Sequence, residues 1–261
     1  MVRKTVIALM LFLTTAANVK AQSDDFGIWT SVEAQKKVNK KLNFDIEGEM
    51  RTRDNTSEMS RWSIGAGVTY KLTKWLKASA GYVFLYDNNV RISYYDETDK
   101  KVIQGLVNVG DPKKRGEYWG ERHRVNVSLT GSYSIGHIDL SLRERWQYTY
   151  RPEKTVDSRY NYYEEEWEDE PHTYDGKGKN VLRSRLQAEY SKKGMPFNPY
   201  ASVEFFNAWS LDKTRFIIGT DYKITKQHIV GLDFKYQAIG HDDDEDSNDL
   251  YILGISYKFK F

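Results

Sequence analysis

The chain has 261 residues, with 39 lysines and arginines against 37 aspartates and glutamates and a formal net charge of +2. This length fits one large domain or two smaller ones, and the near-neutral charge points to no particular partner, nucleic acid included. The chain contains no cysteine. Disulfides, thiol catalysis and acylation as a lipoprotein are therefore excluded.

The amino end has the features of a secretory signal peptide. Two basic residues precede an apolar run at 6–13, and small residues close the segment at Ala21. The run is too short to span a bilayer, which takes roughly 20 residues. We therefore predict a signal peptide at 1–21 and a single domain at 22–261. Its removal leaves 36 basic residues against the 37 acidic ones, so the formal net charge becomes −1.

Apolar and polar residues alternate over most of the remaining chain. The clearest case is residues 42–53, where one face carries Leu42, Phe44, Ile46, Gly48 and Met50 and the other carries Asn43, Asp45, Glu47, Glu49, Arg51 and Arg53. A period of two separates side chains onto the two faces of a strand, whereas a helix would mix them. No run of the mature chain approaches 18 apolar residues, so helical membrane spans are not expected.

Eleven segments show this alternation, some of them weakly. They are 26–35, 42–53, 61–72, 76–86, 124–135, 138–150, 181–190, 199–206, 214–223, 227–239 and 249–261. Glu144 interrupts the apolar face of its segment once. The chain also has 19 Tyr, 7 Trp and 11 Phe, an abundance typical of strands that carry aromatic girdles at both membrane interfaces.

The lengths of the connections predict an orientation. Short or moderate connections at 37–41, 73–75, 135–137, 191–198 and 224–227 alternate with a set that includes all the long ones, at 54–60, 87–118, 152–178, 207–213 and 240–248. Outer-membrane barrels have short periplasmic turns and long extracellular loops, so we expect the carboxyl end in the periplasm. If both chain ends lie in the periplasm, the barrel needs an even number of strands, ten or twelve. Segment 26–35 does not fit this count: it pairs with a further short strand or lies in the lumen.

A soluble β-sandwich or a lipocalin-like barrel is the alternative reading of the alternation. A soluble barrel would have to enclose every large apolar set, and an eight-stranded interior barely holds its own side chains. Aromatic and aliphatic residues on one face suit a lipid-facing exterior better, with the charged sets in a hydrated lumen. We predict an all-β protein, an antiparallel transmembrane β-barrel of about 10–12 strands in a bacterial outer membrane.

Several short motifs resemble an uncharacterised family of single-domain outer-membrane β-barrel proteins that carries a domain-of-unknown-function label. They are Phe26-Gly-Ile-Trp29, Glu47-Gly-Glu-Met-Arg51, Gly-Val-Thr-Tyr70, Ala-Gly-Tyr82, Arg122-His-Arg124 and Glu-Arg145. The resemblance covers essentially the whole mature chain. It implies a fold and a location in the outer membrane, and it brings no activity and no functional residues.

The last residues resemble a carboxyl-terminal assembly signal. Tyr257, Phe259 and Phe261 alternate with lysine or polar residues, and an edge strand with unpaired backbone groups is a natural substrate for strand addition. The resemblance implies the barrel-assembly machinery as a partner. We also expect outer-membrane lipid and lipopolysaccharide around the barrel, and the oligomeric state is left open.

The polar faces carry charges of both signs. The predicted lumen residues are Asp45, Glu47, Glu49, Arg51, Arg53, Arg61, Arg124, Arg143, Arg145, Arg183, Arg185, Glu189, Glu204, Arg215, Asp221, Asp233 and Lys235. In one reading they form a network of ion pairs that fills the lumen, because interior charges must be paired. In the other, arginines on one wall and carboxylates on the opposite wall create a transverse field in a narrow pore for polar or anionic solutes.

The long loops suggest a second hypothesis. Carboxylates cluster at 164–170 and at Asp242, Asp243, Asp244, Glu245 and Asp246, and hard cations prefer oxygen ligands. The runs lack the glycine-punctuated spacing of a calcium loop, and charge runs are usually solvated, so the second run is only a weak metal candidate. Tyrosines and Trp167 among these acids suit contact with carbohydrate or protein, or extend the aromatic belt.

No catalytic constellation is visible, and no cofactor is expected. A serine hydrolase needs a histidine base within reach of the nucleophile, and His123 and Ser128 lie on opposite faces of one segment. We therefore expect a non-enzymatic barrel, either a narrow pore for small polar solutes or a non-conducting structural or surface-binding envelope protein. A barrel lipid hydrolase or acyltransferase is less favoured, because only a triad spread over several strands would serve it.

Overall fold

A computed structural model describes residues 25–239 and 249–261. The predicted signal peptide at 1–21 and the weak metal candidates Asp242 to Asp246 lie outside the described residues. Among those described, no helix is long and apolar enough to cross a membrane.

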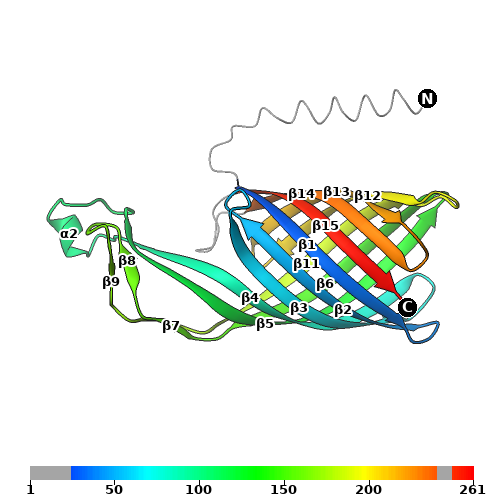
Figure 1. Cartoon of the computed structure of the whole chain (residues 1–261), viewed down its shortest axis with the longest axis horizontal. Coiled ribbons are helices and arrows are strands. Elements are labelled where there is room, and N and C mark those ends of the chain that lie inside the picture. The colour runs from blue at the N-terminus through cyan, green and yellow to red at the C-terminus, as the bar shows by residue number, and fades with distance from the viewer. Residues whose placement is uncertain (1–24, 240–248) are drawn as a thin grey trace, which may run out of the picture.

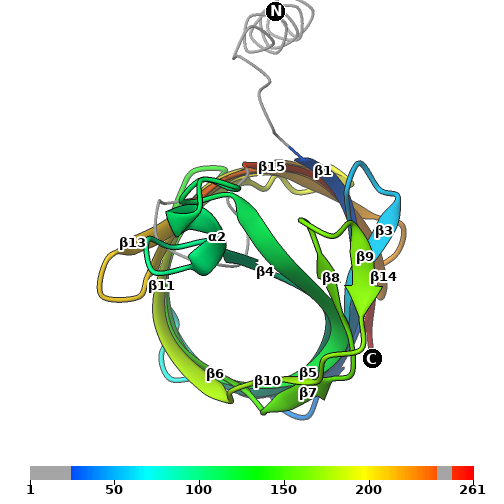
Figure 2. The same cartoon turned by 90° about the vertical axis from the view of Figure 1, so that its left-hand side faces the viewer.

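Eleven long strands form one closed barrel, which confirms the predicted fold class (Figures 1 and 2). The strands are β1 (Asp25–Lys37), β2 (Leu42–Arg53), β3 (Glu58–Lys71), β4 (Leu76–Tyr94), β5 (Pro112–Ile135), β6 (Ile138–Arg151), β11 (Lys177–Tyr190), β12 (Phe197–Asn207), β13 (Leu211–Lys223), β14 (His228–Ile239) and β15 (Leu250–Lys260). Each strand pairs antiparallel with its neighbour along the ring, except at the junction of the first and last strands.

That junction corrects the expected even strand count. β1 pairs directly with β15 in parallel, from Asp25 opposite Leu250 to Gln35 opposite Lys260, and it pairs antiparallel with β2 on its other side. Segment 26–35 is therefore part of the wall, neither a lumen segment nor the partner of a further strand. A parallel pair has slanted but complete hydrogen bonds, so an odd number of strands still closes the ring.

The two ends of the barrel differ as the connection lengths predict. The long connections between strands β4 and β5 and between β6 and β11 lie at one end, together with the short ones at 54–57 and 208–210. Phe261 lies at the other end, and the amino end of β1 lies at the end with the long connections (Figure 1). The turn between β5 and β6 has only two residues, and its Gly136 adopts a φ of +62°. Glycine adopts this left-handed conformation without a steric penalty.

An arm projects from the end opposite Phe261 (Figure 1). The sequence predicted a loop at 87–118, but β4 and β5 continue their pairing from Asp87 opposite Gly120 to Tyr94 opposite Pro112. The outer part of β5 then pairs with β8 (Arg159–Asn161), which pairs with β9 (Glu166–Glu168). The arm also includes helix α2 (Lys100–Ile103) and the paired strands β7 (Lys154–Val156) and β10 (His172–Tyr174).

The outer surface of the barrel is apolar because the alternating faces sort as the sequence predicts. Ile46, Leu142 and Leu232 are more than half exposed, as expected of side chains that face lipid. Glu144 lies on this surface in the middle of β6. Its Oε2 accepts a hydrogen bond of 2.7 Å from the Ser184 hydroxyl on β11, so the one interruption of the apolar face has a polar partner.

Candidate functional site

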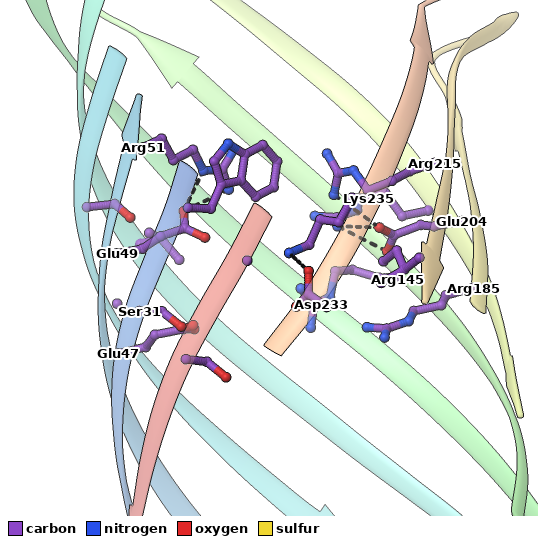
Figure 3. Close-up of a pocket in the computed structure, with 18 of the residues that line it drawn as sticks. Ser31, Glu47, Glu49, Arg51, Arg145, Arg185, Glu204, Arg215, Asp233 and Lys235 are labelled. Carbon is purple, nitrogen blue, oxygen red and sulfur yellow. Dashed lines mark hydrogen bonds and ion pairs between the residues drawn. The ribbon is translucent and has the colours of Figure 1, made fainter. Parts of the chain in front are cut away.

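The interior of the barrel contains a cavity of about 320 Å³ whose lining is dominated by charged side chains (Figure 3). Twelve of the predicted lumen residues line it: Glu47, Glu49, Arg51, Arg124, Arg143, Arg145, Arg183, Arg185, Glu204, Arg215, Asp233 and Lys235. Eight of these are basic and four are acidic, a formal net charge of +4. In a confined site of low dielectric, such a surplus attracts anions more strongly than it would in bulk water.

One buried carboxylate holds three of the arginines. Glu204 on β12 has a side chain only 2% exposed. Its oxygens lie 2.5 Å from Arg143, 3.0 Å from Arg183 and 3.4 Å from Arg215. Charge-assisted hydrogen bonds of this kind are the strong ones in proteins. Glu204 therefore organises guanidinium groups from β6, β11 and β13 around a single point.

The arginines of β6 and β11 oppose each other across the strand pair. Arg143 lies opposite Arg185, and Arg145 lies opposite Arg183. Like charges at directly opposed positions destabilise a sheet, so this block is costly in isolation. Glu204 offsets part of the cost, since it contacts Arg143 and Arg183.

Three cavity arginines keep neutral partners instead. Arg124 donates to the hydroxyl of Thr149 at 3.1 Å, Arg145 to that of Ser128 at 3.0 Å, and Arg185 to the amide oxygen of Gln187 at 2.6 Å. Within residues 25–239 and 249–261, no ion pair joins these three arginines to a carboxylate. Their positive charge is thus available to the cavity.

The opposite wall carries carboxylates from β2. Glu49 accepts a hydrogen bond of 2.7 Å from Arg51. Glu47, two residues earlier on the same face, forms no ion pair or hydrogen bond with a described side chain. Figure 3 shows Glu47 and Glu49 on one side of the cavity and Arg145 and Arg185 on the other. The two walls therefore carry opposite unpaired charge.

Trp29 on β1 narrows the lumen beside this cavity. The guanidinium carbon of Arg51 lies 3.6 Å from the centre of its ring, that of Arg215 lies 4.9 Å away, and Lys235 Nζ lies 5.3 Å away. Each cation–π contact contributes about 0.5–2 kcal/mol. Trp29, Arg51 and Arg215 also border a second cavity of about 250 Å³, so these side chains are shared by the two spaces.

The second cavity lies toward the arm end and includes two more predicted lumen residues, Arg53 and Arg61. Arg61 pairs with Asp87, whose other oxygen lies 2.9 Å from Arg122. A third cavity of about 210 Å³ has eight basic lining residues and one acidic one, Asp212. The positive surplus therefore extends through the arm-side half of the lumen.

The remaining predicted lumen residues lie closer to the short turns. Asp45 faces Gly67, where a Cβ atom would come within 2.6 Å of its carboxylate. Glu189 accepts a hydrogen bond of 2.6 Å from Asn198. Asp221 faces Gly231, where a Cβ atom would lie 3.0 Å from its Oδ1. Glycines on facing strands thus leave room for acidic side chains at this end.

Sequence reasoning missed Trp29, Asp87 and Arg122 as lumen residues. Trp29 alternates with Ser31 and Glu33 on one face of β1, but the sequence left open whether this segment pairs with a further strand or lies in the lumen. Asp87 and Arg122 fell within the predicted loop at 87–118 or just before the predicted strand at 124. Extending the alternation of each strand by two residues toward the arm would have found both.

The other predicted sites lie outside the lumen. Tyr257 and Phe259 are on the outer face of β15, where the Tyr257 hydroxyl lies 2.7 Å from His228 Nδ1, and Phe261 stacks on Phe259 at 5.4 Å. The aromatic loop residues lie on the arm, with Tyr160 and Trp167 in edge contact at 5.9 Å. No group of three potential metal ligands occurs among the described residues.

Ion pairs stabilise the contact between the outer hairpin of the arm and β5. Lys114 on β5 contacts both Glu168, at 2.8 Å, and Glu170. Its hydrogen bond, followed by that of Asn161, lowers the pKa of Glu168 below the usual value of 4.5. The Lys114 hydrogen bond also lowers the pKa of Glu170, with a smaller effect from Arg159. These carboxylates are therefore held ionised at neutral pH.

A closed ring of long strands with an apolar outer face and a charged lumen defines an outer-membrane type of β-barrel. A family model described as "Protein of unknown function (DUF2490)" matches residues 26–248, and the chain belongs to that family. A comparison with curated proteins gave no match.

One solved structure supports the fold, and two others have a lower similarity. The β domain of the Bordetella autotransporter Brka superimposes with a TM-score of 0.54 at 10% sequence identity, over 92% of this chain and 100% of that one. The ferric enterobactin receptor PfeA of Pseudomonas aeruginosa, a mutant form, gives a TM-score of 0.30 at 9% identity, over 77% of this chain and 35% of the receptor. The siderophore receptor PirA of Acinetobacter baumannii gives 0.32 at 11% identity, over 84% and 39%. At such low identity, the autotransporter likeness shows the fold alone.

Proposed function

We propose that the protein is a narrow pore of the bacterial outer membrane that favours small anionic solutes, and that residues 1–21 direct its export. The observation that carries this proposal is the surplus of positive charge in the lumen, where eight basic side chains face four acidic ones around one cavity. Rings and walls of arginine and lysine are the usual basis of anion selectivity in pores. Arg124, Arg145 and Arg185 contribute most, because carboxylates do not neutralise them locally.

The test is the single-channel conductance of the refolded protein in a planar bilayer under a potassium chloride gradient. We expect a reversal potential that indicates preference for chloride. Replacing Arg145 by Gln should move that potential toward zero, because a wall charge that faces the permeating ion is lost. Lys101→Gln is the matched control: it removes one charge from the arm, where Lys101 pairs with Glu164 at 2.9 Å, and should leave selectivity unchanged.

A heat-modifiable shift on a gel confirms folding before each recording. A folded protein that never conducts would show that the ion-pair network and Trp29 close the lumen. Conductance without preference for chloride, or the same effect from Lys101→Gln as from Arg145→Gln, would contradict the assigned role of the arginines.

A further inference from the structure

The cavity leaves charge of opposite sign unsatisfied on two facing walls. Arg145 and Arg185 project from β6 and β11 with only neutral hydrogen-bond partners. Glu47 projects from β2 with no described side-chain partner. Along the ring, β2 is separated from β11 by several strands in either direction. The walls therefore face each other across the lumen (Figure 3).

Within the described residues, no ion pair or hydrogen bond joins Arg145 or Arg185 on one wall to Glu47 on the other. Unpaired charges in a confined interior are costly, so groups of this kind are candidates for ligand sites. Guanidinium groups match the geometry of a carboxylate and bind it with two hydrogen bonds. A single carboxylate opposite them is complementary to an ammonium group. A ligand with both groups would satisfy both walls at once.

The size and charge of the cavity further restrict the range of possible ligands. Its volume of about 320 Å³ is at the lower end of the range for small-molecule sites, which suits a compact molecule. The net charge of +4 favours a ligand in which carboxylates outnumber ammonium groups. A dicarboxylic amino acid has this composition.

We propose that the lumen selects small dicarboxylic amino acids, with carboxylates on Arg145 and Arg185 and the ammonium group on Glu47. This proposal rests on the pore proposed above and names its substrate class.

The experiment compares L-glutamate with the monoamide of glutarate. Both carry one net negative charge and five carbons, but L-glutamate has in addition a second carboxylate and an ammonium group, one for each wall. In the refolded wild-type protein, reversal potentials against chloride should show L-glutamate as the more permeant anion. Calorimetric titration of the same protein in detergent should give an affinity more than tenfold higher for L-glutamate, because one hydrogen bond to a charged group contributes about tenfold and L-glutamate has two additional charged groups.

Two variants assign the roles of the walls. Glu47→Gln should reduce the advantage of L-glutamate over the monoamide about tenfold, because the partner of the ammonium group is lost, whereas Arg145→Gln should weaken both ligands. Glu144→Gln is the control, because it removes the same charge from the barrel wall at a carboxylate outside the lumen. Glu144 accepts a hydrogen bond of 2.7 Å from Ser184 on the outer surface, so its replacement should leave the ratio between the two ligands unchanged.

The outcomes separate this proposal from the pore itself. A chloride-selective pore that treats both ligands alike, or a ratio that changes equally in Glu47→Gln and Glu144→Gln, would contradict the proposed ligand but not the pore. A folded barrel that does not conduct but still binds L-glutamate with the expected ratio would contradict the proposed pore and support the proposed binding site. No conductance and no difference in binding would overturn both.

Discussion

Glu204 is the residue on which the interior of the barrel depends most. Its nearly inaccessible carboxylate accepts from Arg143, Arg183 and Arg215, and it lies next to the opposed arginines of β6 and β11. Removing a single partner from a buried ion pair is strongly destabilising, because the other partner keeps its charge without compensation. Here one removal would leave three cations uncompensated.

We therefore expect Glu204→Gln to lower the free energy of unfolding by about 3 kcal/mol. The measurement is urea unfolding of the refolded protein in lipid vesicles, followed by tryptophan fluorescence and by the heat-modifiable gel shift. Glu58→Gln is the control: Glu58 pairs with Arg53 at 3.1 Å but is 40% exposed, so its replacement should cost less than about 1 kcal/mol. Equal losses from both variants would contradict the role given to Glu204.

For much of the lumen, the sequence was sufficient to predict which side chains lie on the polar face of each strand. Parity along a strand is a local property, so Glu47, Arg145 and Glu204 could be assigned to the polar face without knowing their neighbours. Their partners could not be assigned. Whether Glu204 meets arginines from three strands depends on the order and stagger of the strands, and these arise from closure of the whole ring.

Among the strands, β1 is the one whose pairing could not be predicted from the sequence. Strand assignment succeeded because hydrophobic alternation and short turns are local. The ring junction is not local, since it joins segments more than two hundred residues apart in the chain. A rule based on even strand counts then excluded the arrangement that the structure has, a parallel junction. Trp29 was lost from the predicted site for the same reason.

The parallel junction predicts a specific disulfide. Thr30 lies opposite Ile255 across β1 and β15, and directly paired residues on neighbouring strands lie within the Cα separation that a disulfide needs. The native chain has no cysteine, so the double variant Thr30→Cys with Ile255→Cys has no competing thiol. We expect it to form an intramolecular disulfide on mild oxidation, seen as a mobility shift that reductant reverses.

The control for this junction moves one cysteine along the same face. Tyr251 lies opposite Phe26, four residues from Thr30 in register, a displacement of about 13 Å along the strand. The pair Thr30→Cys with Tyr251→Cys should therefore stay reduced under the same conditions. A disulfide in the control pair and none in the test pair would contradict the parallel register and indicate a shifted one.

At the scale of the whole molecule, the barrel and the arm are held together by different forces. Every barrel strand has two neighbours, so the ring has no free edge and its backbone hydrogen bonds are cooperative. The outer hairpin of β8 and β9 pairs with β5 at Lys114 and Arg115; one further backbone hydrogen bond, from Tyr162 to Lys113, and the ion pairs of Lys114 add to this contact. The arm should consequently open at a lower free energy than the barrel.

Acid should separate the two parts. The lowered pKa values of Glu168 and Glu170 mean that the closed arm binds fewer protons than the open arm near pH 4.5. Their stabilising effect is therefore complete above the usual carboxyl pKa and is lost as the pH falls through the lowered values. Hydrogen exchange corrected for intrinsic rates should show residues 154–174 losing protection between pH 5 and pH 3 while the strands of the ring keep theirs. Glu168→Gln should make the hairpin exchange faster at pH 7 than it does in the wild-type protein, because one of the two ion pairs of Lys114 is lost. Unchanged protection of the arm across this range, or parallel loss in the ring, would mean that the arm is an integral part of the barrel and not a separately opening extension.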